Sequence, residues 1–406
     1  MSRFFNYESE TWKQKTAIFL VSQMFSIFGS SIVSYAIIWH ITLKTSSAKV
    51  MTLSIITSFL PQIFISLFAG VWADRYNRKV IIMLSDTMSA LASLFLAIFL
   101  ARGSYSLGMI FLVNAIRSIG TGIQLPAVSA ILPQLVPEDK LTRVNGINSS
   151  LTSVLLIASP AAGGALLGTM GFAAALYVDV FTAFAAVLIM ALLKYENMRE
   201  KDDSAPGEEA STLAFMREGF EYIKNNPMIR DLLVFYMLFF FLVAPAAFLS
   251  PIMVERSFGP EVWKLTANEI VWTSGSILDG IIISVWGGFK NKLATMTLSS
   301  VGFGITFMMI GFAKNIWVYL VIMFISGIFM PLFATAETVL IQENVEEHML
   351  GRVFSFVQII ISVVMPLGML LFGPLGDAVK IEYIIMGTGI CILMLSPFIM
   401  RIRKSD

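Results

Sequence analysis

Apolar residues fall in long uninterrupted blocks along the chain, and short polar stretches separate them. A helix needs about 20 apolar residues to cross the ~30 Å hydrocarbon core of a bilayer. The blocks lack the two-residue alternation of strands, and lipid offers no partners to backbone amides, so each block predicts a membrane-spanning helix. We place these spans near residues 15–39, 50–72, 80–101, 106–131, 144–168, 172–193, 230–254, 267–288, 293–313, 316–340, 354–374 and 382–400.

The longest polar stretch, residues 194–227, divides these spans into six and six. We therefore expect an all-α integral membrane protein with two pseudo-symmetric six-helix bundles, residues 1–193 and 228–406, and a cytoplasmic linker between them. Within the linker, Ser211–Asn226 has apolar residues at helical spacing, which predicts a short amphipathic helix on the membrane surface. A plain linker is the alternative.

Two short sequence matches relate the halves. Gly122–Pro126 (GIQLP) resembles Gly327–Pro331 (GIFMP), and Val136–Val144 resembles Val345–Val353 further along each half. Both pairs fall at the fourth and fifth spans of their halves. Related halves of this kind are typical of secondary transporters, which hold substrate between the halves near the bilayer midplane.

Lysine and arginine set the expected orientation. With the N-terminus inside, inner segments hold 20 of the 28 Lys and Arg residues and outer segments hold seven. This bias predicts a multi-pass protein of the cell membrane with both termini cytoplasmic. The first apolar block is too long for a signal peptide and lacks a cleavage pattern, so we expect no cleaved leader.

Composition excludes several classes of protein. The chain is 57% hydrophobic and 14% charged, with one cysteine, Cys391, and two distant histidines, His40 and His348. These residues offer neither a metal site nor a catalytic constellation, so no enzyme is expected. The sequence has no phosphate-binding loop of an ATP-driven pump, no repeated charged ring of a channel and no basic stripe for nucleic acid.

The connection after the second span, Gly70–Lys79 (GVWADRYNRK), resembles the signature loop of the major facilitator superfamily. Physically, Gly70 would let a neighbouring helix approach closely, and Asp74 could accept from amides at a helix N-terminus. Asn77 replaces the family's usual glycine and tolerates a left-handed conformation. An ordinary basic inner loop is the alternative. The resemblance implies a conformational lock made of Gly70, Asp74, Arg75, Arg78 and Lys79, with Arg352 in the second half.

The fifth span contains Ser159-Pro160 followed by Gly163-Gly164, which resembles the Gly-Pro-x-x-Gly-Gly signature of drug antiporters with Ser159 in place of the first glycine. Pro160 removes a helical hydrogen bond, and the glycines remove side-chain bulk. We expect a pliable hinge here. Ordinary packing of small residues is the alternative.

Among the ionisable residues inside the spans, we single out five as candidates. Arg117 begins a degenerate copy of the superfamily's Arg-x-x-Gln-Gly motif, in which Gly120 stands at the Gln position. A charge near the midplane costs at least ~2.5–3.5 kcal/mol, so it should face a cavity or a partner. A carboxylate takes up a proton when it is buried in apolar surroundings and releases it next to a cation or water. A structural role is the alternative for each of these residues. We expect Asp179 and Asp279 to couple protons, and Asp86 and Glu337 to act at the inner gate.

Flexible and aromatic side chains suggest a substrate cavity, because Met and aromatic residues adapt to varied ligands. The candidates are Met24, Phe28 and Tyr35 on the first span and Tyr236 and Phe240 on the seventh. Core packing or contact with lipid is the alternative for each.

Over nearly its whole length the chain is similar to the drug:proton antiporter branch of this superfamily, which includes bacterial macrolide efflux proteins. The resemblance rests on Gly70–Lys79, Arg117–Gly122, Val178–Val180 and Leu350–Ser355. It implies a monomer that exports small amphipathic compounds across the lipid bilayer, with protons as the energy source and no cofactor. A proton-coupled importer of the same superfamily is the alternative, and the fifth span favours the exporter.

Overall fold

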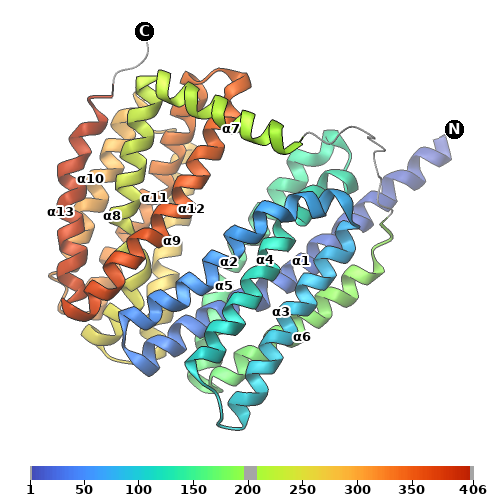
Figure 1. Cartoon of the computed structure of the whole chain (residues 1–406), viewed down its shortest axis with the longest axis horizontal. Coiled ribbons are helices and arrows are strands. Elements are labelled where there is room, and N and C mark those ends of the chain that lie inside the picture. The colour runs from blue at the N-terminus through green and yellow to red at the C-terminus, as the bar shows by residue number, and fades with distance from the viewer. Residues whose placement is uncertain (1, 196–207, 403–406) are drawn as a thin grey trace. The chain divides into compact units, whose positions relative to one another are not determined.

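The computed structural model describes residues 2–195 and 208–402, without the side chains of residues 2–11, Leu67, Asp74 and 208–215. This part of the chain forms thirteen helices and no strand (Figure 1). They are α1 (Ser2–Thr45), α2 (Ala48–Arg75), α3 (Arg78–Ala101), α4 (Leu107–Leu135), α5 (Glu138–Thr169), α6 (Phe172–Leu192), α7 (Glu208–Asn225), α8 (Pro227–Phe258), α9 (Val262–Trp286), α10 (Lys292–Ile310), α11 (Ile316–Asn344), α12 (Glu347–Ala378) and α13 (Ile381–Ile399).

Twelve of the described helices are long and apolar enough to cross a membrane. They confirm the predicted spans and the all-α membrane fold. The remaining helix, α7, lies where a short helix was predicted in the linker. Large apolar side chains also point outward, including Phe181 at 72% exposure and Val285 at 85%. Such exposure suits contact with lipid, because bilayer hydrocarbon is as apolar as these side chains.

The chain divides into two compact units. The first comprises Met1–Thr45, Leu53–Lys201 and Glu261–Thr266, and the second comprises Ser46–Thr52, Asp202–Pro260 and Ala267–Asp406. Helix pairs recur between the units: α1 packs on α5 and α6 as α8 packs on α12 and α13, and α3 packs on α4 and α6 as α10 packs on α11 and α13. The start of α2 belongs to the second unit, and the start of α9 belongs to the first.

The repeated glycines mark equivalent helix crossings. In the first unit, a Cβ at Gly122 of α4 would lie 2.9 Å from the carbonyl oxygen of Gln62 on α2. In the second unit, a Cβ at Gly327 of α11 would overlap the carbonyl oxygen of Trp272 on α9. Only glycine permits such close contact between helix backbones. The sequence match between the halves therefore has a packing cause.

Candidate functional site

An ion pair joins Arg117 of α4 to Asp179 of α6 inside the first unit. The two side chains are only 9% and 1% exposed. The Ser93 hydroxyl of α3 donates to Asp179 at 2.6 Å, and Arg117 also donates to the carbonyl of Ser30 on α1 at 3.3 Å. Four helices thus meet at one buried pair of opposite charges.

Asp86 lies two helical turns from Ser93 along α3, on the same face. Its Oδ1 atom accepts from Ser26 of α1 at 2.6 Å and from Gln124 of α4 at 3.0 Å. Its Oδ2 atom is buried and has no hydrogen-bond partner among the described residues. The structure therefore brings three predicted residues, Asp86, Arg117 and Asp179, into one region, which we call the polar column.

Gly120 lets α3 and α4 pack closely enough to align the polar column. A Cβ there would lie 2.7 Å from the Ser89 hydroxyl and 3.3 Å from the Ser85 carbonyl oxygen. A larger residue would therefore push the two helices apart. In the sequence, Gly120 stands at the glutamine position of the family motif. Gln124, one turn further along α4, supplies the amide that contacts Asp86, and sequence reasoning missed it.

The other two predicted carboxylates belong to the second unit. Asp279 of α9 and Glu337 of α11 are 1% and 3% exposed. Three of their buried carboxylate oxygens have no hydrogen-bond partner among the described residues. These are both oxygens of Asp279 and the Oε1 atom of Glu337. Within the same part of the chain, no group of three or more His, Cys, Asp or Glu residues could hold a metal ion.

Two of the predicted cavity aromatics pack in the core of the second unit. Tyr236 and Phe240 are each 3% exposed, and their rings lie 5.9 and 6.5 Å from the ring of Phe333. In the first unit, Met24, Phe28 and Tyr35 are half-buried along α1. The ring of Tyr35 lies 5.4 Å from that of Trp39.

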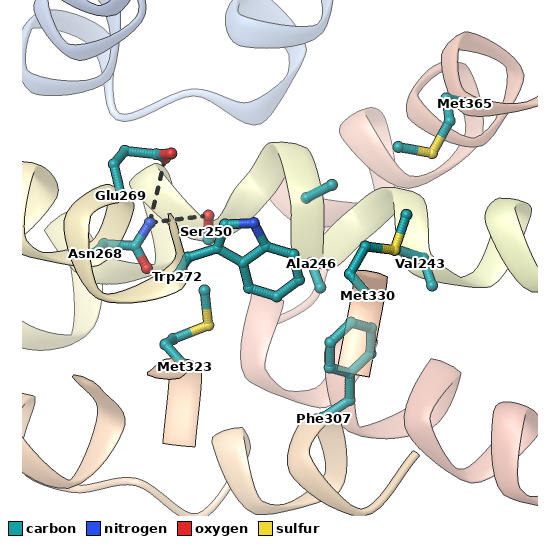
Figure 2. Close-up of a pocket in the computed structure, with 11 residues that line it drawn as sticks. Val243, Ala246, Ser250, Asn268, Glu269, Trp272, Phe307, Met323, Met330 and Met365 are labelled. Atoms are coloured by element: carbon teal, nitrogen blue, oxygen red, sulfur yellow. Dashed lines mark hydrogen bonds between the residues drawn. The ribbon is translucent and has the colours of Figure 1, made fainter. Parts of the chain in front are cut away.

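A cavity of about 240 Å³ lies inside the second unit, further along α8 than Tyr236 and Phe240, and neither residue lines it. Figure 2 shows Glu269 and Trp272 of α9 at its wall. Sequence reasoning missed Glu269, although the predicted span 267–288 contains it, because it lies only two residues from the start of that span. The helix begins at Val262, so Glu269 sits two turns inside it. The lining residues are Val243, Ala246, Ala247, Ser250, Asn268, Glu269, Trp272, Phe307, Met323, Met330 and Met365.

The signature loop differs from its expected geometry at Asn77. Among the described residues, no atom lies within 4 Å of a Cβ placed on Gly70, and the close helix approach expected there stays a prediction. Asn77 is not left-handed: its φ is −66°, and its side chain caps α3 by accepting from the amides of Lys79 and Val80. A short polar side chain satisfies these free amides as glycine could not.

The basic residues of this loop bind main-chain carbonyls. Arg78 donates to the carbonyls of Ala73 and Ala130 at 3.0 and 2.9 Å. Lys79 donates to two carbonyls at the end of α6, those of Ala191 and Leu193. These bonds tie the start of α3 to the ends of α4 and α6. Arg75 is exposed, and the predicted contact of the Asp74 carboxylate lies outside the described side chains.

Arg352, the lock residue predicted in the second half, pairs with the linker helix. Its guanidinium donates to Glu218 of α7 at 2.9 Å. Gly219 makes the contact close, because a Cβ there would lie 3.1 Å from the Cβ of Arg352. In the second unit, the pair thus fastens α7 to α12.

Comparison with known proteins decides the family. The sequence profile of the Major Facilitator Superfamily matches residues 19–368, which covers most of both halves. The chain belongs to the Major Facilitator Superfamily. This superfamily member is 30% identical over 400 residues to macrolide efflux protein A of Streptococcus pyogenes, with 97% of this chain and 98% of the relative covered. It is 23% identical over 389 residues to the multidrug efflux pump Tap of Mycolicibacterium fortuitum, with 93% and 94% covered.

Solved structures of other transporters share the major facilitator fold. The nucleoside transporter NupG superposes with a TM-score of 0.70 at 14% identity, covering 98% of this chain and 100% of that one. A bacterial homologue of the iron transporter ferroportin gives a TM-score of 0.73 at 14% identity, covering 96% and 98%. At such low identity these matches show the fold alone. The predicted membership of the superfamily and its resemblance to macrolide efflux proteins are confirmed.

The antiporter-like segment of this major facilitator protein is a close packing surface. Gly163 of α5 faces the backbone of α1, where a Cβ would lie 3.4 Å from the Ile32 carbonyl oxygen. At Gly164 a Cβ would overlap the side chain of Thr266, in the start of α9 that belongs to the same unit. Ser159 and Pro160 are buried beside them. A side chain at Gly164 would therefore clash, whereas a Cβ at Gly163 would only touch α1. The predicted hinge motion stays a prediction.

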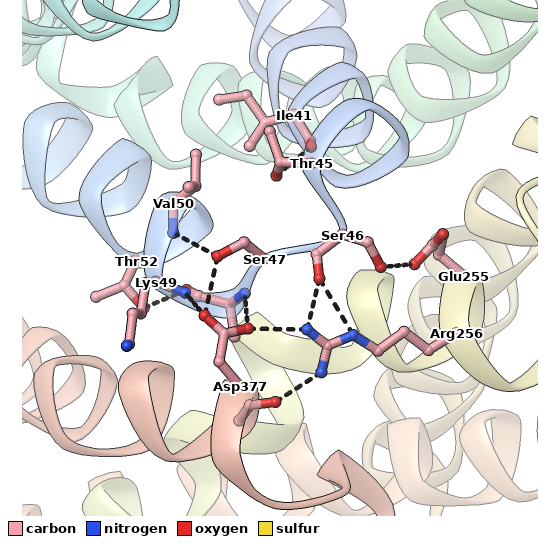
Figure 3. Close-up of polar contacts among 12 residues, drawn as sticks. Ile41, Thr45, Ser46, Ser47, Lys49, Val50, Thr52, Glu255, Arg256 and Asp377 are labelled. Atoms are coloured by element: carbon pink, nitrogen blue, oxygen red, sulfur yellow. Dashed lines mark hydrogen bonds and ion pairs between the residues drawn. The ribbon is translucent and has the colours of Figure 1, made fainter.

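A polar cluster holds the start of α2 within the second unit (Figure 3). Asp377 of α12 accepts from the amides of Ala48 and Lys49 at 2.7 and 3.0 Å, so it caps α2 from another helix. Arg256 of α8 donates to Asp377 at 2.8 Å. Ser46, with φ at 47°, donates to Glu255 at 2.5 Å. A non-glycine residue in this conformation is strained, and such strain persists only where its surroundings impose it.

Proposed function

We propose that this major facilitator protein is a proton-coupled exporter of amphipathic compounds. The polar column carries the proposal, since a transporter driven by protons needs an ionisable group whose partner can be removed within the membrane. Two relatives with well-covered sequences, named for macrolide efflux and multidrug efflux, support export as the direction.

The proposed coupling step is protonation of Asp179. In its ionised form, Asp179 neutralises Arg117 and shares the hydroxyl of Ser93. A proton on the carboxylate would cancel this attraction and leave the guanidinium buried without a counter-charge, which is strongly unfavourable. Arg117 would then seek other partners, and the packing of α1, α3, α4 and α6 around it would change.

Asp86 is the second proposed proton carrier. Its Oδ1 atom accepts two hydrogen bonds. Its Oδ2 atom has no hydrogen-bond partner among the described residues, so it is the proposed site of protonation. Gln124 and Arg117 lie two turns apart on α4, so a shift of this helix would move the partners of both acids together. Asp279 remains proposed as a further carrier in the second unit, and Glu337 remains proposed as a residue of the inner gate.

Alternating access also needs contacts that exist in only one state. With both termini cytoplasmic, as the distribution of Lys and Arg predicts, the cluster around Asp377 lies on the outer side. We propose that it must break for the outer side to open. The signature loop lies on the inner side in the same orientation, where we propose that it acts in the opposite state. The Arg352–Glu218 pair is formed together with the Asp377 cluster and holds α7 against α12 in this state.

Transport by purified protein in inside-out and right-side-out vesicles tests the proposal. With an imposed pH gradient, a fluorescent amphipathic dye should accumulate in inside-out vesicles, and a protonophore should abolish the accumulation. Asp179→Asn should lose this dependence. Asp139→Asn, which changes a 68% exposed carboxylate in the first turn of α5, should keep it. Accumulation only in right-side-out vesicles would establish import instead. Full dependence on the gradient in Asp179→Asn would place the coupling elsewhere.

A further inference from the structure

We propose that the cavity beside Glu269 is a binding site for an amphipathic compound bearing a single positive charge. This inference rests on the proposed transport function and names the chemical class that the site would select. Every lining residue that the structure describes belongs to the second unit, so the site is built within one bundle.

Glu269 supplies the charge of the site. It is the only acidic residue among the described lining residues, and none of them is Lys, Arg or His. Among the described residues, the side-chain amide of Asn268 donates a hydrogen bond to Glu269 at 3.4 Å. A carboxylate can accept about four hydrogen bonds, so this one long contact leaves most of its capacity for a ligand.

Neighbouring polar groups hold Asn268 in this orientation. The buried Tyr319 hydroxyl donates to the Oδ1 atom of Asn268 at 2.7 Å. This bond fixes which end of the amide is the acceptor, so the nitrogen faces Glu269 and Ser250 (Figure 2). The carboxylate is therefore supported by a built polar network at one end of an otherwise apolar cavity.

The rest of the wall suits the apolar body of a cation. Trp272 follows Glu269 by three residues on α9, so both side chains lie on the same face of the helix and at the cavity wall. An indole face attracts a cation within ~6 Å of the ring. Three methionines from α11 and α12, with Phe307 from α10, provide soft and polarisable packing.

Charge selects among the ligand classes. A neutral ligand would leave the Glu269 carboxylate desolvated and uncompensated, and an anion would be repelled by it. A divalent metal ion prefers six or more oxygen ligands for calcium, or water-rich octahedral geometry for magnesium, and this wall offers one carboxylate. A monovalent cation with apolar substituents satisfies both the charge and the apolar surface.

Equilibrium binding to the purified full-length protein tests the inference without any gradient. The probe is radiolabelled benzyltrimethylammonium, and benzenesulfonate of similar size is the anionic comparison. Glu269→Gln should weaken binding of the cation by about tenfold or more, since a desolvated charge contact is lost. Glu269→Asp should retain a preference for the cation, and Trp272→Leu should weaken binding more than Trp272→Phe.

Glu343→Gln is the matched control, because Glu343 is exposed on α11 and should leave the affinity unchanged. If Glu269→Gln fails to fold, the Trp272 pair and the comparison of the two probes still decide the outcome. Equal binding of both probes, or unchanged affinity in Glu269→Gln, would overturn the inference. Cation binding without export would refute the proposed function alone, whereas export that is indifferent to Glu269 would refute only this site.

Discussion

Thr266, in the first turns of α9, lies directly against Gly164 of α5, at a spot where any side chain on residue 164 would overlap the threonine hydroxyl. Thr52, in the first turns of α2, lies in the same way against Gly373 of α12. The two contacts occupy equivalent places in the two halves. Each contact packs the start of one helix, α9 or α2, against a glycine on a helix of the same unit.

Gly164→Ala should destabilise the protein, because an added methyl would overpack the contact with Thr266, at a cost of about 1–3 kcal/mol. Thermal unfolding of the purified variant in detergent measures the effect. Gly168→Ala is the matched control on the same helix, since its Cβ would lie 3.7 Å from its nearest neighbour, the Cβ of Val262. Equal stability of the two variants would contradict the packing role of Gly164.

Removing one partner of the Arg117–Asp179 pair should cost about 3–5 kcal/mol of stability, because the other charge stays buried without compensation. The double variant Arg117→Met/Asp179→Leu should recover most of that stability and still fail to transport. Unfolding and transport measured on the same preparations separate the two effects. Proton-driven transport by the double variant would refute the coupling role of the pair.

Asp377→Ala should loosen the start of α2, since it removes a cap worth about 1 kcal/mol and the partner of Arg256. In a Cys391→Ser background, a cysteine at position 52 should then react several times faster with a membrane-impermeant maleimide on intact cells. Glu382→Ala, which removes a neighbouring carboxylate bonded to Ser257, is the control and should leave the labelling rate unchanged. Equal labelling in both variants would argue against the cluster as an outer lock.

Ser118→Ala should destabilise α2 beside Pro61, which lies inside this helix. The Ser118 hydroxyl accepts from the amide of Gln62 at 2.9 Å and donates to the carbonyl of Ser58 at 2.6 Å. It therefore stands between the two backbone groups that would pair with each other in a regular helix. Loss of both contacts should cost about 1–3 kcal/mol, since two backbone groups become unsatisfied. Ser129→Ala, which loses only a bond within its own helix, should unfold at the temperature of the parent protein.

Sequence reasoning singled out Arg117 and Asp179 and overlooked Glu269 for one physical reason. A charge deep in an apolar block stands out, because the block itself defines the membrane. A charge near the end of a block is ambiguous, since hydropathy alone does not fix where the helix begins. Gly70 shows a related limit: a glycine in a known motif suggests close packing, but only the neighbouring helix decides whether anything packs there.

The apolar blocks alone determined that this chain crosses the membrane twelve times as helices, because a backbone in hydrocarbon must satisfy its own hydrogen bonds. The repeated Gly122 and Gly327 segments also revealed the two halves before any coordinates. Tertiary structure alone decided which groups meet: Arg117 with Asp179, Gln124 with Asp86, Asp377 with the start of α2. Such partners come from different helices, and their meeting depends on the shapes of packed helix surfaces, which no local pattern of residues encodes.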